Sequence, residues 1–94
     1  MEYQNMKVEF LEAAHTASIL ILLNDHGKIM KTVAWSQVSN GRQGLTDRFN
    51  YLEKLGLIEV DKTLRSGSGH WVSLTDKGKE IAEHLIAIEQ ILES

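Results

Sequence analysis

The 94-residue sequence contains no cysteine, and this absence excludes disulfide bonds, thiolate metal sites and thiol chemistry. It also has no long apolar run: the longest, Ile19 to Leu23, has five residues. A membrane-spanning helix needs roughly 20 residues. The first residues, Met1 to Asn5, lack the basic and then apolar pattern of an export signal. We therefore expect a cytoplasmic protein with no membrane partner, because a reducing compartment suits a chain without cysteine.

Motifs typical of enzymes are missing as well. The sequence has no Gly-x-Ser-x-Gly elbow, no phosphate-binding Gly-Lys-Ser/Thr loop and no Gly-x-Gly-x-x-Gly nucleotide motif. Its histidines, His15, His26, His70 and His84, have no spacing typical of a metal site. Glu80 lies one helical turn from His84 and could form half of a site shared by two subunits, but a solvated or interfacial histidine is the better interpretation. We expect no enzyme, no cofactor and no metal.

The charge that is present is unevenly distributed. The formal net charge is −3, yet residues 28–79 carry nine Lys or Arg against five Asp or Glu, a balance of +4. Residues 1–27 carry −3 and residues 80–94 carry −4. A basic middle between acidic ends fits a nucleic-acid face in the middle of the chain, with chance clustering as the alternative.

The spacing of apolar residues predicts helices in the first half of the chain. The first spans about residues 7–24 and ends before Gly27, a glycine suited to a left-handed C-cap. Thr32 caps a short second helix that ends at Ser39, and a turn separates it from a third helix over about residues 42–55. Two helices joined by so short a turn, here over residues 32–55, form a helix–turn–helix.

After Gly56 the pattern changes from a helical to a strand period. Residues 57–64 alternate as a half-buried strand, and residues 70–74 form a second strand. The glycine- and serine-rich segment between them predicts a hairpin, residues 57–74, with a flexible, cationic tip. Residues 28–31 suffice for one short edge strand only.

The last segment, residues 76–93, predicts a helix capped by Thr75, with Asp76 at its positive end. The large aliphatic residues of this helix follow a heptad spacing, which indicates a seam for dimerisation. The predicted dimerisation residues are Ile81, Leu85, Ile88 and Leu92.

This order of elements and two motifs resemble the winged-helix transcription regulators of the MarR/PadR/ArsR type. Residues 45–58, LTDRFNYLEKLGLI, are similar to the family's recognition helix running into L-x-x-x-G-L-I, and residues 74–80, LTDKGKE, to the L-T-x-K-G start of its final helix. The resemblance covers about residues 15–86, and by size it is nearest to small archaeal members that dimerise through a terminal coiled coil. It departs at Trp35, where the family usually has a small residue.

The resemblance implies an α+β, mainly α, winged helix–turn–helix fold: a three-helix core, a β-hairpin wing and a C-terminal dimerisation helix, with residues 1–94 as a single domain. In such a fold the third helix enters the major groove of duplex DNA, where polar side chains on its first turns read base edges. The predicted contacts on this recognition helix are Arg42, Gln43, Gly44, Thr46, Asp47, Arg48, Asn50 and Lys54.

The side chains in this set suit different tasks. Gln43 and Asn50 fit adenine edges, and Arg42 fits guanine, whereas Arg48 and Lys54 suit phosphates at the flanks. Gly44 either lets the backbone approach DNA closely or is a plain turn residue. Asp47 either accepts from a cytosine amine or pairs with Arg42 or Arg48, and we favour the pair.

The hairpin supplies a second set of candidates, in which Arg65 is the preferred contact to phosphate or the minor groove. This set is Lys62, Arg65, Ser66, Ser68 and His70. A merely mobile tip is the alternative for a segment so rich in glycine and serine.

The sequence therefore predicts a homodimeric transcription regulator that binds double-stranded DNA sequence-selectively. Two alternatives stay open: a winged-helix protein–protein interaction module, which the acidic net charge favours, and a non-specific, chromatin-type DNA-binding protein. A small-molecule effector is possible, but no residue specifies one.

Overall fold

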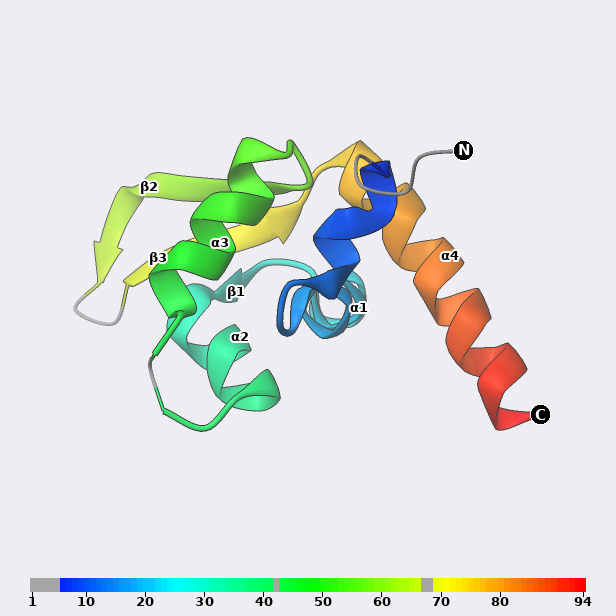
Figure 1. Cartoon of the computed structure of the whole chain (residues 1–94). Helices are drawn as coiled ribbons and strands as arrows, with labels where there is room; N and C mark the ends of the chain where they lie inside the picture. Colours follow the sequence, from blue (N-terminus) through cyan, green and yellow to red (C-terminus); the bar gives the residue numbers. More distant parts are fainter. Residues whose placement is uncertain (1–5, 42, 67–68) are drawn as a thin grey trace.

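The computed structural model describes residues 6–41, 43–66 and 69–94, with side chains described outside residues 62–66 and 69. The elements follow the expected order (Figure 1). They are η1 (Lys7–Glu12), α1 (Thr16–His26), β1 (Ile29–Met30), α2 (Lys31–Val38), α3 (Leu45–Lys54), β2 (Ile58–Ser66), β3 (Gly69–Leu74) and α4 (Asp76–Glu93).

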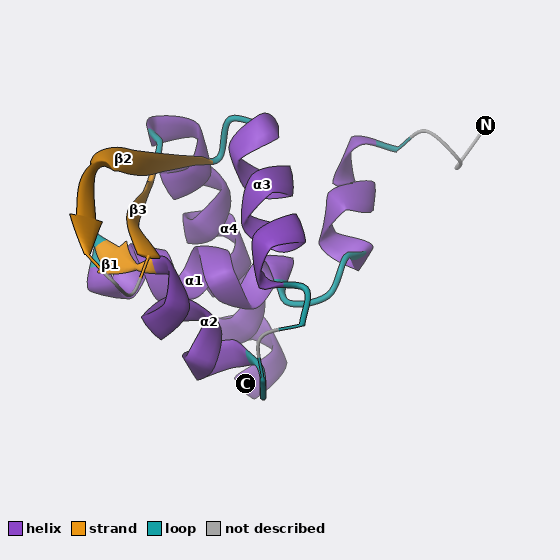
Figure 2. Cartoon of the chain, turned by 90° about the vertical axis from the view of Figure 1, so that its left-hand side faces the viewer, coloured by secondary structure: helices purple, strands orange, loops and turns teal. Residues whose placement is uncertain are grey.

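The three strands form one antiparallel sheet in the order β1-β3-β2, which confirms the short edge strand and the hairpin. β1 pairs with β3 through Ile29 and Val72, and β2 pairs with β3 from Ile58 opposite Leu74 onward. The register of β2 against β3 shifts between Asp61 and Ser66. The distal part of the hairpin extends to one side of the helices, as a wing does (Figures 1 and 2).

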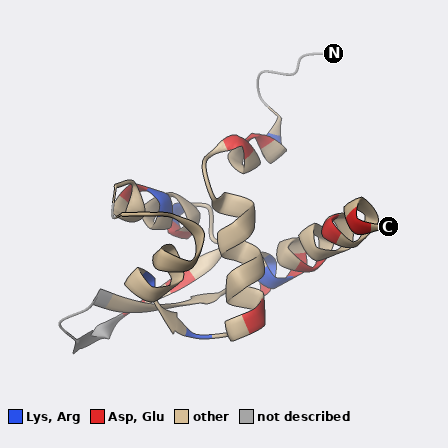
Figure 3. Cartoon of the chain, turned by 90° about the horizontal axis from the view of Figure 1, so that it is seen from below, with Lys and Arg blue, Asp and Glu red and all other residues tan. Residues whose placement is uncertain are grey.

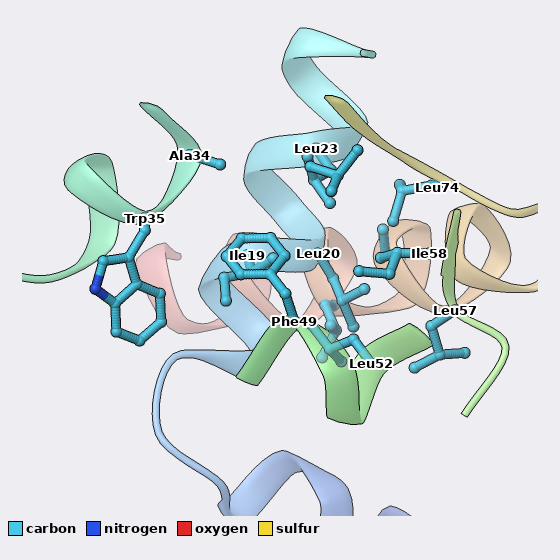
Figure 4. Packing of buried hydrophobic residues seen from close by; sticks show 13 residues of the cluster. Ile19, Leu20, Leu23, Ala34, Trp35, Phe49, Leu52, Leu57, Ile58 and Leu74 are labelled. Atoms are coloured by element: carbon cyan, nitrogen blue, oxygen red, sulfur yellow. The ribbon is translucent and has the colours of Figure 1, made fainter. Parts of the chain in front are cut away.

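Helix α1 lies at the centre of the core. Its side chains Ile19, Leu20 and Leu23 are at most 1% exposed and pack against α2, α3 and the sheet (Figure 4). From α3 the core receives Phe49 and Leu52, both fully buried. Burial of each large apolar side chain stabilises the fold by about 1.5–3 kcal/mol, so α1 and one face of α3 are held firmly together.

The prediction of a single first helix over residues 7–24 is wrong, because the helical conformation is interrupted between residues 13 and 15. A 3₁₀ helix, η1, is followed by His15 in the left-handed conformation, with φ 68°, before α1 begins. The buried Thr16 hydroxyl lies 3.1 Å from both the Phe10 and the Ala13 carbonyl oxygens. A hydroxyl that bonds to nearby carbonyls stabilises a break, which apolar spacing cannot reveal.

The helix–turn–helix is present, but its boundaries differ from the prediction. α2 begins at Lys31 with Met30 at its N-cap, so Thr32 is an internal residue and not the cap. α3 begins at Leu45, because Gly44 at its N-cap has a φ of 86° that ends the preceding turn. The recognition helix is therefore shorter than the predicted residues 42–55.

The two sequence motifs contact each other, and this contact fixes the start of α4. Thr75 caps α4 as predicted, its Oγ1 accepting from the Gly78 N–H at 3.0 Å, while the same hydroxyl donates to the Gly56 carbonyl at 2.7 Å. The Thr75 N–H also donates to the Leu57 carbonyl at 3.1 Å. Gly78 is buried, and a Cβ on it would lie 2.0 Å from the Leu57 carbonyl oxygen. The glycine of the second motif therefore serves close packing of α4 on the chain after α3.

Candidate nucleic-acid interface

Helix α3 separates its residues into a buried and an exposed face. Leu45 is half-buried, and Phe49 and Leu52 are fully buried against the core. Thr46, Asp47, Asn50 and Lys54 are exposed. With 3.6 residues per turn, Thr46, Asn50 and Lys54 follow one another along the exposed side of the helix. The structure thus brings four of the predicted recognition residues onto one open face of α3. The helix itself lies beside the hairpin (Figures 1 and 2).

The remaining recognition candidates lie elsewhere. Gln43 is exposed but belongs to the turn before α3, and Gly44 is the N-cap, which favours its interpretation as a turn residue. Arg48 is half-buried on the flank of α3, and its Nε is buried without a hydrogen-bond partner. Arg42 lies outside the described residues. No described contact joins Asp47 to Arg48, so the preferred pairing of Asp47 receives no support from Arg48.

Trp35 explains how the turn before α3 is held. Its ring is 3% exposed and makes edge contacts with His15 and Phe49, with centroids 5.3 and 6.3 Å apart. Its Nε1 donates to the Gly41 carbonyl at 2.9 Å. The resemblance predicts a small residue at position 35. Trp35 instead packs into the core and forms a hydrogen bond with the α2–α3 turn.

A hollow of about 240 Å³ lies between α2 and the start of α3, and the sequence did not suggest it. Its wall includes the hydroxyl-bearing residues Thr32, Ser36 and Ser39, together with Gly41 and Leu45. No side chain caps the N-terminus of α3. Backbone N–H groups at a helix start and nearby hydroxyls are groups that bind phosphate oxygens. In the sequence, these hydroxyl-bearing residues could have been recognised only from their spacing along a short helix.

The hairpin is described only in part. Lys62, Arg65 and Ser66 lie on β2, but their side chains are outside the described part of the structure, and Ser68 lies outside the described residues. His70 lies on β3, half-buried, and its Nδ1 is buried without a hydrogen-bond partner. The contact of His70 with DNA stays a prediction, because its ring is only half-buried and lies near the tip end of β3.

An acidic hollow borders the C-terminal end of α3. Its lining includes Glu53 of α3 and Glu59 and Asp61 of β2, with Lys28 donating to the Asp61 carboxylate at 2.9 Å. The described lining thus carries three carboxylates and one ammonium.

The predicted dimerisation seam is divided by the structure. Leu85 is 8% exposed and Ile81 is half-buried, so both already contact the core of a single chain. Ile88 and Leu92 are 51% and 78% exposed. Only the second half of the heptad pattern is thus a free apolar surface in the single chain.

Two further observations concern the described residues. Within them, His, Asp and Glu side chains nowhere gather in a group of three or more that would hold a metal ion. Among the helices described, none combines the length and apolar character that a membrane crossing requires.

Comparison with known proteins identifies the fold. No family model matches the sequence, and no curated protein matches it significantly. Solved structures do match. AF1382 from Archaeoglobus fulgidus aligns with a TM-score of 0.75 and 19% identity, covering 95% of this chain and 99% of its own. The transcriptional regulator homologue from Pyrococcus horikoshii OT3 aligns with a TM-score of 0.74 and 21% identity, over 94% and 89%.

A larger protein matches as well. The MarR family transcriptional regulator SPO1453 from Silicibacter pomeroyi DSS-3 aligns with a TM-score of 0.69 and 23% identity, over 82% of this chain. The present chain spans 54% of the length of that regulator. Element order, sheet topology and these alignments agree, so this chain has the winged helix–turn–helix fold of the MarR-type regulators.

Proposed function

We propose that this chain is a transcription regulator that binds duplex DNA sequence-selectively as a homodimer. The observation that carries the proposal is the exposed polar face of α3, a helix that lies beside a hairpin wing. One of the similar structures is named a MarR family transcriptional regulator and another a transcriptional regulator homologue protein, which supports the same function here. Because a fold does not determine function, the argument rests on the chemistry of this face.

The N-terminal half of α3 enters the major groove in this proposal. Thr46 and Asn50 are exposed and uncharged, so they can approach base edges without the cost of burying a charge. Asn50 is suited to the paired donor and acceptor of adenine, and Gln43 reaches the same groove from the preceding turn.

Phosphate contacts on both sides of α3 fix its position. The hydroxyl side of α2, with Ser36 and Ser39, and the free N-terminus of α3 bind one strand of the backbone. The cations of the wing, Lys62 and Arg65, bind the backbone or the minor groove on the other side. Such contacts position the protein and carry little sequence information.

The wing has a specific test. Arg65→Ala is expected to weaken binding to all duplexes alike and to reduce the slope of log affinity against log salt by about one. Fluorescence anisotropy at several salt concentrations measures this slope. An unchanged slope would remove Arg65 from the phosphate contacts.

Selection of bound sites from random duplexes tests the proposed function directly. A homodimer with two recognition helices should enrich one pseudo-palindrome whose half-sites lie about one helical turn, roughly 34–36 Å, apart. Binding without enrichment would instead indicate a non-specific, chromatin-type protein. Absence of binding would leave the protein–protein interaction module as the better assignment.

A further inference from the structure

The turn between α2 and α3 contains Asn40 followed by Gly41, the only asparagine–glycine pair in the sequence. Both residues are exposed, and both lie outside helix and strand. Asn40 also borders a hollow of about 330 Å³ beside α2, whose lining includes His15, Ser36 and Ser39. The Asn40 amide is therefore open to water.

The fold has no evident use for an asparagine at this position. Among the described residues, no hydrogen bond or ion pair holds the Asn40 side chain. Asparagine is often selected where the backbone needs a positive φ, but His15 is the only described non-glycine residue with one. Neither a side-chain contact nor the backbone conformation of the turn therefore requires Asn40.

The peptide nitrogen of Gly41 is a nucleophile that can react with this amide. A backbone nitrogen can attack the side-chain carbonyl carbon of the preceding asparagine, and a side chain on the attacking residue hinders the approach. Gly41 has no side chain, and its φ of 81° is a conformation open mainly to glycine. Within the described part of the chain, its N–H donates no hydrogen bond. Both reacting groups are therefore free.

The other asparagines that the structure describes lie in a different setting. Asn24 belongs to α1 and Asn50 to α3. The residues that follow them, Asp25 and Tyr51, have side chains, and their backbone N–H groups donate within the helix. Of the three described asparagines, only Asn40 combines a free amide with an unhindered neighbour.

We propose that Asn40 is a site of spontaneous deamidation that lowers the affinity of the chain for DNA as the protein ages. The Gly41 nitrogen attacks Cγ of Asn40, the N–Cγ bond forms and the Cγ–Nδ2 bond breaks. Ammonia leaves with the proton of the Gly41 N–H. One water molecule then opens the cyclic imide at either carbonyl, which gives aspartate or isoaspartate at position 40.

The new carboxylate would lie in a segment that has no negative charge. Residues 26–46, which include α2 and the turn, contain no Asp or Glu, and Figure 3 shows no acidic residue on α2. The neighbours of Asn40, Ser39 and Gly41, line the hollow to which the proposed function assigns a DNA phosphate. A negative charge beside this hollow repels phosphate, so the consequence for DNA rests on the proposed function.

The isoaspartate product has a second effect. It adds one methylene group to the main chain directly before Gly41. The Gly41 carbonyl accepts from Trp35 Nε1 at 2.9 Å, and this bond holds the turn that leads into α3. A longer main chain at this point displaces either that bond or the start of α3. We therefore expect the isoaspartate form to bind DNA more weakly than the aspartate form.

Peptide mapping tests the reaction, because trypsin places each described asparagine in a separate fragment. Asn24 lies in fragment 8–28, Asn40 in 32–42 and Asn50 in 49–54. The folded chain is incubated in water enriched in heavy oxygen and digested in ordinary water, so that only conversion before digestion carries the isotope. Fragment 32–42 should gain heavy oxygen and separate into aspartate and isoaspartate forms, faster at mildly alkaline than at neutral pH. The other two fragments should stay unchanged.

Asn40→Gln is the matched control for the reaction. It keeps an amide at position 40, but the larger imide ring that glutamine must form closes much more slowly. Its fragment 32–42 should therefore remain unlabelled at position 40. A folded wild-type chain that keeps Asn40 intact while the chain unfolded in urea loses it would overturn the proposal.

The consequence for DNA is tested with Asn40→Asp and a short random-sequence duplex. Fluorescence anisotropy should show binding roughly three- to tenfold weaker than that of fresh wild type, with an unchanged Tm because Asn40 is exposed. Asn40→Gln should bind as fresh wild type does and should keep its affinity through an incubation that weakens the wild type. Gln90→Glu adds the same charge on α4, and an equal loss there would overturn the local effect.

The failure of this proposal can be distinguished from that of the proposed function. A fresh wild-type chain that binds no duplex contradicts the DNA-binding function and with it the assigned consequence, while peptide mapping still decides the reaction at Asn40. A chain that binds duplex equally well before and after conversion overturns the consequence and leaves the DNA-binding function standing.

Discussion

Helices α3 and α4 both bury one face in the same core, yet they expose opposite chemistry. On α3 the open face carries Thr46, Asp47, Asn50 and Lys54, all polar. On the second half of α4 the open face carries Ile88, Ile91 and Leu92, all large and apolar. A polar face remains stable in water and can exchange its hydrogen bonds for those of base edges, whereas an apolar face gains free energy when a partner covers it.

The contrast separates two roles that the helical period alone does not distinguish. Both helices are amphipathic, and both turn large apolar residues inward. The chemistry of the outward residues differs. The polar face of α3 is suited to hydrogen bonds with base edges, and the apolar face of α4 is suited to contact with a second apolar surface. Substitutions on and beside the two helices test this contrast, in order of decreasing expected effect.

Gly78→Ala should detach α4 from the body while leaving the chemistry of α3 unchanged. The new Cβ would collide with the Leu57 carbonyl oxygen, a backbone atom that cannot turn aside. Overpacking of this kind costs about 1–3 kcal/mol or more, and thermal unfolding should show it as a lower Tm. Glu80→Ala, exposed on the same helix, should change stability by less than about 0.5 kcal/mol. A stable Gly78→Ala variant would mean that α4 is not held against the Leu57 backbone.

Asn50→Ala should impair reading of DNA without altering the fold. The loss of one bidentate base contact should cost about 1–3 kcal/mol on the selected site. Affinity for random duplexes should barely change, and because Asn50 is exposed the Tm should stay the same.

Lys54→Ala provides the matched comparison on the same face of α3. It should weaken binding to selected and random duplexes equally, because an ammonium attracts phosphate groups whatever the base sequence. Titration of both variants against both duplexes gives the specificity ratio for each. If Asn50→Ala leaves that ratio unchanged, α3 does not read bases through this residue.

Trp35→Phe should loosen the turn that sets the start of α3. The phenyl ring retains apolar packing but cannot donate to the Gly41 carbonyl, and loss of this hydrogen bond costs about 0.5–1.5 kcal/mol. The Tm and the affinity for the selected site should both decrease. Phe49→Leu, which alters the neighbouring ring contact but leaves the indole bond intact, should lower stability with less effect on specificity. Identical losses of specificity in the two variants would contradict a separate role for the Gly41 bond.

Glu59→Gln should produce the smallest effect. Removal of one carboxylate from the acidic hollow reduces repulsion of phosphate, so affinity for all duplexes should rise by roughly 1.5- to fivefold. Glu83→Gln, exposed on α4, removes the same charge away from α3 and serves as the control. Equal gains from both variants would mean that net charge, and not the hollow beside α3, limits binding.

Much of the fold could be predicted from the sequence. Leu45, Phe49 and Leu52 marked the buried side of α3, and Thr75 marked the start of α4, because helical spacing and capping act over only a few residues. The hairpin followed from the change of period after Gly56. The break at His15 escaped prediction, since the Thr16 hydroxyl and its carbonyl partners leave no trace in apolar spacing.

The candidate site could be predicted only in part. Thr46, Asp47, Asn50 and Lys54 share a face because α3 is a regular helix, and that much follows from their spacing. The start of α3 at Leu45, the hollow beside Ser36 and Ser39, and the acidic hollow beside Glu53 depend on elements that meet only in the folded chain. A heptad pattern likewise treated Leu85 and Leu92 as equivalent.

The order of the main helices and strands, the inward residues of α3 and the cap at Thr75 follow from the sequence alone, because these features depend on neighbours along the chain. Tertiary structure alone decided that Leu85 belongs to the core while Ile88, Ile91 and Leu92 remain bare, because α1 and η1 cover α4 only along its first half. It also decided why Gly78 must lack a side chain, since the Leu57 carbonyl that excludes one is 21 residues earlier in the sequence. Contacts between residues far apart in the sequence decide which face of a helix is covered and which remains exposed. The spacing of residues along one helix does not contain this information.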